Sequence, residues 1–147
     1  MLWLTRAMTV ALLLFPVSGQ GEEPPQPVVS VAGLWFGEGH QPELKMDMVW
    51  LVQRNEDGTF VFDARRYHEC KMIFRQVEKG RWRQVGLQYF TTTESIEGTP
   101  FHAEDKYLIE QITPKDMTYR HLKSNTKFEA RRISPTVGFP LPSRCSI

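Results

Sequence analysis

The chain has 147 residues, with 18 lysines and arginines balanced by 17 aspartates and glutamates. This length suits one domain with a substantial core and leaves little room for a second. Because nucleic-acid binding requires a basic face, the balanced charge argues against a nucleic-acid partner.

Residues 1–19 have the three parts of a secretory signal peptide. Arg6 gives a positive start, residues 7–15 form a short apolar run, and residues 17–19 are small enough for cleavage. A membrane anchor, the alternative, needs about twice that apolar length. Removal of Arg6 leaves 17 basic residues (18 minus 1) against 17 acidic ones. We therefore expect a secreted or periplasmic mature protein that is near neutral and has no membrane span.

Residues 20–27 contain three prolines and two glutamates, which predicts a disordered linker. From Val28 onward the sequence changes to short runs in which apolar and polar residues alternate, as they do on β-strands with one buried face. The first of these runs holds Gly33-Leu34-Trp35. No segment shows a convincing helical period.

The next runs predict hairpins. Residues 44–54 and 59–70 alternate with a period of two, and the Asn-Glu-Asp-Gly sequence between them predicts a four-residue loop. A third run, residues 71–78, ends at Lys79-Gly80, which predicts a tight turn.

The fourth run, residues 81–92, contains Gly86, which suggests a bend or bulge of the kind that barrel closure needs. Which face of this run points inward is left open by its pattern. Residues 93–102 include a glycine and a proline and are expected to form the longest internal loop.

Three further runs complete the series: residues 105–113, 117–123 and 127–133. Hairpin-length connections join each successive pair, so the strands should form a meander. About eight such strands close most simply into an all-β, up-and-down antiparallel barrel, here over residues 28–133. The proline-containing tail, residues 134–147, should be an extended strap with Phe139 and Leu141 against the barrel wall.

The chain has two cysteines, Cys70 at the end of a predicted strand and Cys145 in the tail. In an oxidising compartment an isolated pair of this kind predicts a disulfide. Two free thiols are the alternative, and a free thiol on an extracytoplasmic tail would be a liability. We therefore expect the tail to be tied to the barrel by a Cys70–Cys145 bond.

The layout resembles the lipocalin or calycin group of small barrels. The residues that carry the resemblance are Gly33-Leu34-Trp35 in the first strand and an arginine late in the last strand, either Arg131 or Arg132. In that family the tryptophan closes one barrel end and the arginine packs over its ring. The chain departs from the pattern after the barrel, where prolines replace the family's helix, and its second loop motif is not recognisable. The resemblance implies a barrel that binds a small ligand.

The predicted interior is rich in methionines and aromatic residues, which suit an adaptable apolar site. A filled core without a cavity is the alternative. The inward set is Met46, Met48, Trp50, Phe62, Tyr107, Ile109, Met117 and Tyr119.

Three polar residues continue the inward faces at even spacing: Arg66, His68 and His121. Inside the barrel they could bind a carboxylate or phosphate head group, with Arg66 making the bidentate contact. Alternatively they sit at the barrel mouth, where the interior meets solvent, and strand ends favour this second interpretation.

The sequence contains no recognisable catalytic motif and no metal-binding cluster. His68 and Cys70 share one face of a strand, but a zinc site needs three or four ligands. His40 and His102 stand alone in predicted loops. None of the hydrolase, protease, P-loop or dinucleotide-binding motifs occurs. We expect a non-enzymatic protein without a cofactor.

Two hypotheses of function follow. The first is a secreted or periplasmic lipocalin-like protein that binds a small, partly apolar ligand inside the barrel. The second is a protein-binding or inhibitory module that has a filled core and uses the segment 93–102 for contact.

Overall fold

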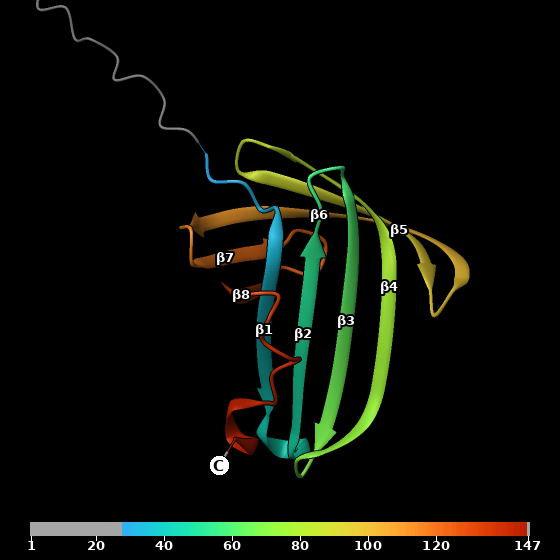
Figure 1. Cartoon of the computed structure of the whole chain (residues 1–147), viewed down its shortest axis with the longest axis vertical. Helices are drawn as coiled ribbons and strands as arrows, with labels where there is room; N and C mark the ends of the chain where they lie inside the picture. Colours follow the sequence, from blue (N-terminus) through green and yellow to red (C-terminus); the bar gives the residue numbers. More distant parts are fainter. Residues whose placement is uncertain (1–27, 147) are drawn as a thin grey trace, which may run out of the picture.

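The structure, a computed structural model, describes residues 28–146. Eight antiparallel strands follow one another around a closed barrel in chain order (Figure 1), as the meander pattern predicted. Nearly all regular structure is strand, with two single-turn 3₁₀ helices. The elements are β1 (Gly33–Gln41), η1 (Pro42–Leu44), β2 (Met46–Arg54), β3 (Thr59–His68), β4 (Lys71–Val85), β5 (Gln88–Ile96), β6 (Thr99–Ile112), β7 (Asp116–His121), β8 (Thr126–Arg132) and η2 (Ser143–Cys145).

The period-two pattern sets the inner and outer faces of the barrel. Trp35 on β1 lies opposite Val52 on β2, which in turn lies opposite Phe62 on β3. Residues directly across a ladder point to the same face, so these three side chains face inward. The intervening residues Phe36 and Leu51 point outward, where a second, smaller apolar cluster forms.

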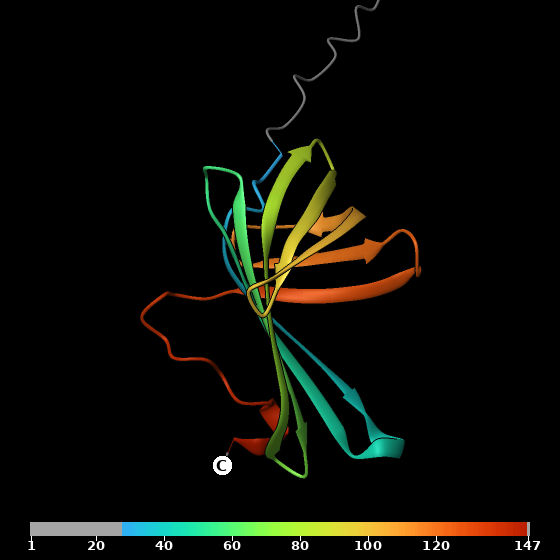
Figure 2. The ribbon, with the colours of Figure 1, turned by 90° about the vertical axis from the view of Figure 1, so that its right-hand side faces the viewer.

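The seam that closes the barrel is short. Strand β1 pairs with β8 at only three positions, ending at Gly37 opposite Ala130, whereas it pairs with β2 along its whole length. A Cβ atom on Gly37 would collide with the Trp50 ring, so glycine allows that ring to lie against β1 where the two strands part. Beyond this point β1 and β2 diverge from β7 and β8, and a wedge opens between them (Figure 2).

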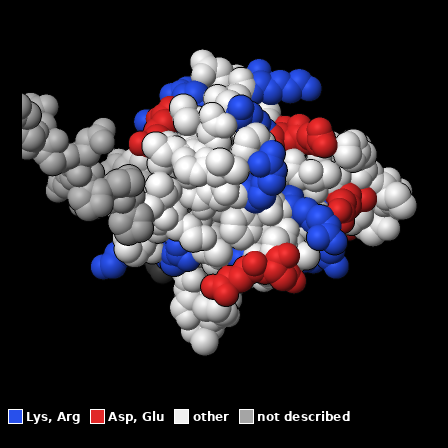
Figure 3. Space-filling view, turned by 90° about the horizontal axis from the view of Figure 1, so that it is seen from above, with Lys and Arg blue, Asp and Glu red and all other residues white. Residues whose placement is uncertain are grey.

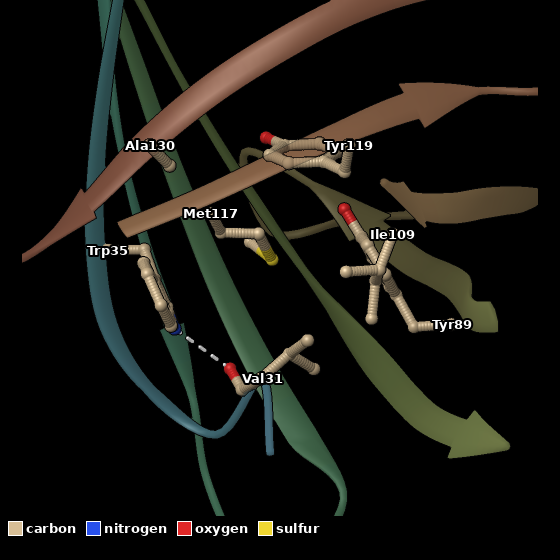
Figure 4. Packing of buried hydrophobic residues seen from close by; sticks show 7 residues of the cluster. All are labelled: Val31, Trp35, Tyr89, Ile109, Met117, Tyr119 and Ala130. Carbon is tan, nitrogen blue, oxygen red and sulfur yellow. Dashed lines mark hydrogen bonds between the residues drawn. The ribbon is translucent and has the colours of Figure 1, made fainter. Parts of the chain in front are cut away.

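One end of the barrel is sealed by a buried cluster around Trp35 (Figure 4). The indole Nε1 of Trp35 donates a hydrogen bond to the carbonyl of Val31 at 2.9 Å. The Gln84 side chain accepts a bond from the Val31 amide and donates one to the Val29 carbonyl. The chain entering β1 therefore crosses the end of the barrel and is fixed to β4 on the far side. The cluster consists of Val31, Trp35, Tyr89, Ile109, Met117, Tyr119 and Ala130.

Arg132 completes this seal. Its guanidinium lies 4.3 Å above the Trp35 ring and donates hydrogen bonds to the carbonyls of Ala32, Ser30 and Pro114. The neighbouring Arg131 faces outward and lies over Phe36 at 5.0 Å instead. Of the two arginines proposed for packing at the barrel end, Arg132 occupies that position.

The turn predicted at Lys79-Gly80 is wrong, because β4 continues through it. That pair lies inside a single 15-residue strand, at a shift in register between β4 and β5. A Cβ on Gly80 would collide with the Thr92 carbonyl, so glycine allows the neighbouring backbone to approach closely. The turn is at Gly86, which has φ +58 and was expected to be a bend within a strand. The sequence interpretation had placed the turn at Gly80 and the irregularity within a strand at Gly86, and the structure shows the reverse.

The segment 93–102 is not a long loop. Its residues belong to β5 and β6, which pair up to Ile96 opposite Thr99 and leave only Glu97-Gly98 as the turn. Both turn residues have positive φ, +50 and +76, which a tight hairpin connection requires. Gly98 was correctly placed in a connection, but that connection is much shorter than expected.

The tail is tied to the barrel by the predicted disulfide. Cys70 and Cys145 are bonded across 75 residues of sequence, with their Cα atoms 5.4 Å apart. Phe139 packs beside the outer cluster of β1–β3 and lies 3.6 Å from the Arg65 guanidinium. Leu141 is 52% exposed, so its expected contact with the wall was wrong, and Pro142 is the buried neighbour instead.

The proposed signal peptide (1–19) and linker (20–27) lie outside the described residues. Between residues 28 and 146, no helix has the length and apolar character that a membrane span requires. The face drawn in Figure 3 carries charges of both signs interspersed.

Candidate functional site

The barrel interior contains a cavity of about 320 Å³ that is partly open to the surface. This volume lies at the lower end of the range for small-molecule sites. Its lining is more polar than the sequence predicted, because an arginine, two carboxylates, a histidine and three tyrosines accompany the apolar side chains. The lining residues are Val52, Arg54, Phe60, Phe62, Glu78, Tyr89, Thr91, Thr93, Asp105, Tyr107, Tyr119, His121 and Phe128.

Arg54 lies at the sealed end of this cavity. It pairs with Gly33 in the β1–β2 ladder and is only 4% exposed. Its Nη2 donates a long hydrogen bond of 3.3 Å to the Tyr89 hydroxyl, and its guanidinium lies 4.9 Å from the centre of the Tyr89 ring. Within residues 28–146, its Nε and Nη1 atoms are buried and have no hydrogen-bond partner.

Three tyrosines form the wall beside Arg54. The rings of Tyr89 and Tyr107 stack with centroids 4.5 Å apart, and Tyr119 meets both edge-on. Burial raises the pKa of all three hydroxyls above the ordinary tyrosine value. They therefore remain protonated at neutral pH and can donate hydrogen bonds into the cavity.

A histidine with two partners lies on β7 at the other side of the cavity. His121 Nε2 is 2.7 Å from an Asp105 carboxylate oxygen, and its Nδ1 is 2.7 Å from the Ser124 hydroxyl. The residue types match a Ser-His-Asp triad, but nucleophilic catalysis also needs donors aimed at a developing oxyanion. Ser124 belongs to the β7–β8 turn and its hydroxyl also bonds Thr126 at 2.8 Å. We interpret the hydrogen bonds among Asp105, His121 and Ser124 as fixing the conformation of the β7–β8 turn.

A groove of about 760 Å³ occupies the wedge between β1, β2 and β8. Its lining combines apolar side chains with charged ones. Phe128 lines both the groove and the inner cavity, and its ring meets Trp50 edge-on at 5.7 Å. The two spaces are therefore separated by this aromatic pair. The groove is lined by Glu38, Gly39, His40, Gln41, Leu44, Met46, Asp47, Met48, Trp50, Arg66, Thr126, Lys127, Phe128 and Glu129.

The predicted site residues are divided between these two spaces. Phe62, Tyr107, Tyr119 and His121 line the inner cavity, whereas Met46, Met48, Trp50 and Arg66 line the groove.

The remaining members of the predicted set lie elsewhere. Ile109 and Met117 are packed in the sealed end. His68, opposite Met46 at the end of β3, is exposed and lines neither space. Arg66 is also exposed and lies 5.2 Å from the Phe74 ring, so both residues are at the barrel mouth.

Sequence reasoning missed Arg54 and Tyr89 as interior residues. Arg54 has the same parity as Trp50 and Val52 on β2, so the alternation already placed it on the inward face. Tyr89 was placed on one side of a run whose inward face was left open. Locating the turn at Gly86 would have separated the two strands of that run.

The described residues contain no group of three or more His, Cys, Asp or Glu side chains arranged to hold a metal ion. No protein-family model matches the sequence, and no curated protein matches it as a relative. The fold is compatible with a lipocalin-like barrel, and the argument for function rests on the geometry of the cavity and the groove.

Proposed function

We propose that this protein is a secreted or periplasmic lipocalin-like barrel that binds a small, partly apolar ligand without chemical conversion. The observation that carries the proposal is the adjacency of a cavity of about 320 Å³ inside the barrel and a groove of about 760 Å³ beside it, with Phe128 lining both. A barrel built only for stability would fill its interior with side chains. The Cys70–Cys145 bond supports an oxidising compartment.

The wedge between β1 and β8 gives the ligand a route to the interior. Because β1 and β8 pair at only three positions, the wall on that side is open below Gly37. Trp50 and Phe128 stand at the boundary, and rotation of one aromatic side chain would join the two spaces. Met46 and Met48 offer adaptable apolar surface for the part of the ligand outside the cavity.

The alternative, a protein-binding module with a filled core, has less support. The segment 93–102 is a regular hairpin with a two-residue turn rather than an extended loop. The interior also contains a cavity.

Native mass spectrometry and fluorescence titration test the proposal. The purified protein should carry, or take up at one-to-one stoichiometry, an amphiphile such as dodecanol or dodecanoate. Binding should change the emission of Trp50, which lines the groove. Thr91→Phe should abolish uptake, because Thr91 lines the cavity and a ring there would occupy it.

Thr92→Phe is the matched control, because residue 92 points to the opposite face of the same strand. It should leave binding unchanged, and circular dichroism should show that both variants keep the β-structure. If neither amphiphile binds the unmodified protein, or if Thr91→Phe binds as well as Thr92→Phe, the interior is not the site.

A further inference from the structure

The buried guanidinium of Arg54 is not compensated by the residues around it. Burying a charge without a partner is strongly unfavourable, so buried arginines normally have a carboxylate beside them. Here the guanidinium has five N–H donors, and the groups that interact with it within residues 28–146 are the neutral hydroxyls of Tyr89 and Tyr119. Two of its three nitrogens have no partner there.

The carboxylates that line the same cavity have other partners. Asp105 accepts a hydrogen bond from His121 at 2.7 Å. Glu78 accepts one from the Gln76 side-chain amide, also at 2.7 Å. Neither forms an ion pair with Arg54 among the described residues, so the charge at the sealed end is not neutralised by these groups.

A second cation increases the positive charge at that end. Arg132 is fixed over Trp35 in the seal, and burial together with the nearby charge of Arg54 lowers the pKa of Arg132. The two arginines are therefore close enough to repel each other. An anion beside Arg54 would relieve that repulsion as well as occupy the free donors.

We infer that the ligand of this barrel carries an anionic oxygen head group, a carboxylate or a phosphate, which enters first and binds the Arg54 guanidinium at the sealed end. The inference rests on the proposed function and specifies the class of ligand. The hydroxyls of Tyr89 and Tyr119 lie on the same wall and add neutral donors. The apolar part of the ligand then extends past Phe128 into the groove between β1, β2 and β8.

This orientation differs from the head-group contact that the sequence offered as one of two interpretations. Arg66 was the first candidate for a head-group contact, but it is exposed at the mouth beside Phe74. Water already solvates a charge there, so a contact with an anion contributes little. At Arg54 the same contact takes place away from water, where a charge-assisted hydrogen bond is stronger.

The experiment compares three probes with the same tail: dodecanoate, dodecyl phosphate and dodecanol. Dissociation constants are measured by calorimetry on the full disulfide-bonded protein at pH 7.5. The unmodified protein should bind at least one of the two anions about tenfold or more tightly than dodecanol. The anion that binds more tightly identifies the head group as a carboxylate or a phosphate.

Arg54→Met keeps the length of the side chain and removes the charge. It should weaken binding of the preferred anion by about tenfold to a hundredfold and leave dodecanol within about twofold. Arg54→Lys keeps a charge but loses the planar donor arrangement, and it should retain a smaller preference for the anion. Arg66→Met tests the alternative head-group contact. Because Arg66 lines the groove, the measure is the ratio of the anion and dodecanol affinities, which should change by no more than about twofold. Arg83→Met is the matched control, because Arg83 is exposed, lies 3.9 Å from the Phe90 ring and lines neither space, and it should change neither affinity by more than about twofold.

Thermal unfolding separates this role from a structural one. Arg54→Met should melt at the same temperature as the unmodified protein or higher, because it removes a buried charge without a partner. A lower melting temperature together with unchanged anion affinity would assign Arg54 to stability and overturn the inference.

The failure of this inference differs from the failure of the proposed function. If dodecanol and the anions bind equally, or if the loss follows Arg66→Met, ligand binding stands and the Arg54 assignment is wrong. If none of the three probes binds, the proposed function fails and the inference fails with it.

Discussion

The two ends of the barrel are stabilised in different ways. At the sealed end, Trp35 is 1% exposed and lies within a cluster of seven buried residues, with Arg132 bonded to three carbonyl groups above it. At the splayed end, β1 beyond Gly37 has no partner strand on its β8 side and its residues are exposed. A disulfide and the hydrogen bonds of the tail hold that end.

This contrast shows that one sheet can contain a rigid region and an accessible one. Burial of large side chains stabilises the sealed end, because each excludes water from a substantial apolar area. The splayed end exposes Leu44, Met72 and Phe74, and its burial is limited to the smaller outer cluster that includes Val49 and Tyr67. The covalent link and ion pairs of the outer surface add to that cluster, which leaves the inner face of the groove free to contact a ligand.

Removal of the sealing indole should have the largest effect. Trp35→Ala should lower the free energy of unfolding by about 3–5 kcal/mol, as truncation of a buried aromatic residue does. Denaturant titration followed by circular dichroism measures it. Leu122→Ala, at an exposed site in the β7–β8 turn, is the control and should stay within about 0.5 kcal/mol. Equal losses in the two variants would show that the seal is not where the stability lies.

Removal of the disulfide should come next. The double variant Cys70→Ser, Cys145→Ser should lose about 2–4 kcal/mol, since the bond constrains a long loop in the unfolded chain. Hydrogen exchange should also show that the β3–β4 hairpin opens locally, while the sealed end exchanges only through global unfolding. If both ends lost protection to the same extent, the barrel would behave as one unit and the contrast between its ends would be wrong.

Acidification should have the smallest effect and should act on the outer surface of β3 and β4, where Asp63 lies between Leu51 and Val77. Partial burial acts to raise the pKa of Asp63, but hydrogen bonds from Arg75 and Arg65 outweigh it and hold that pKa below its usual value. A depressed pKa contributes stability that is present above the pKa of the unfolded chain, about 3.9, and is lost as the pH falls through the folded value.

Asp63→Asn should therefore cost about 1 kcal/mol at pH 7, and this cost should shrink as the pH falls below about 3.9 and disappear once the carboxyl group is protonated in both states. Urea titrations of the two proteins across this range measure the difference. A difference that does not depend on pH would mean that the side chain acts through packing rather than charge.

The strand pattern could be predicted from the sequence because one face of each strand is buried. Alternation along residues 44–54 and 59–68 fixes which side chains face inward, whatever the rest of the chain does. The glycines were harder to interpret. Gly80 permits close approach of another strand, and Gly86 adopts a left-handed turn conformation. Glycine is the residue type that suits both purposes, so the sequence alone does not distinguish them.

The site was predicted only in part. Alternation predicts that apolar residues such as Phe62 and Tyr119 face the interior. The same rule also predicts an inward position for Arg54, although its side chain is charged. What the sequence could not show is that β1 and β8 part at Gly37, because the length of a seam between the first and last strands depends on the curvature of all eight. The groove, and the division of the inward residues between two spaces, result from that curvature.

The position of Cys70 has a consequence for biosynthesis. Its partner follows 75 residues later, after all of β4–β8, so five strands are synthesised after Cys70 before the correct cysteine is available. During that interval the Cys70 thiolate can attack a disulfide of another molecule and form a mixed disulfide, and the displaced sulfur leaves as a thiolate. Correct oxidation then requires the barrel to close first and to bring the tail beside Cys70. Formation of the Cys70–Cys145 bond therefore follows folding of the barrel and does not drive it.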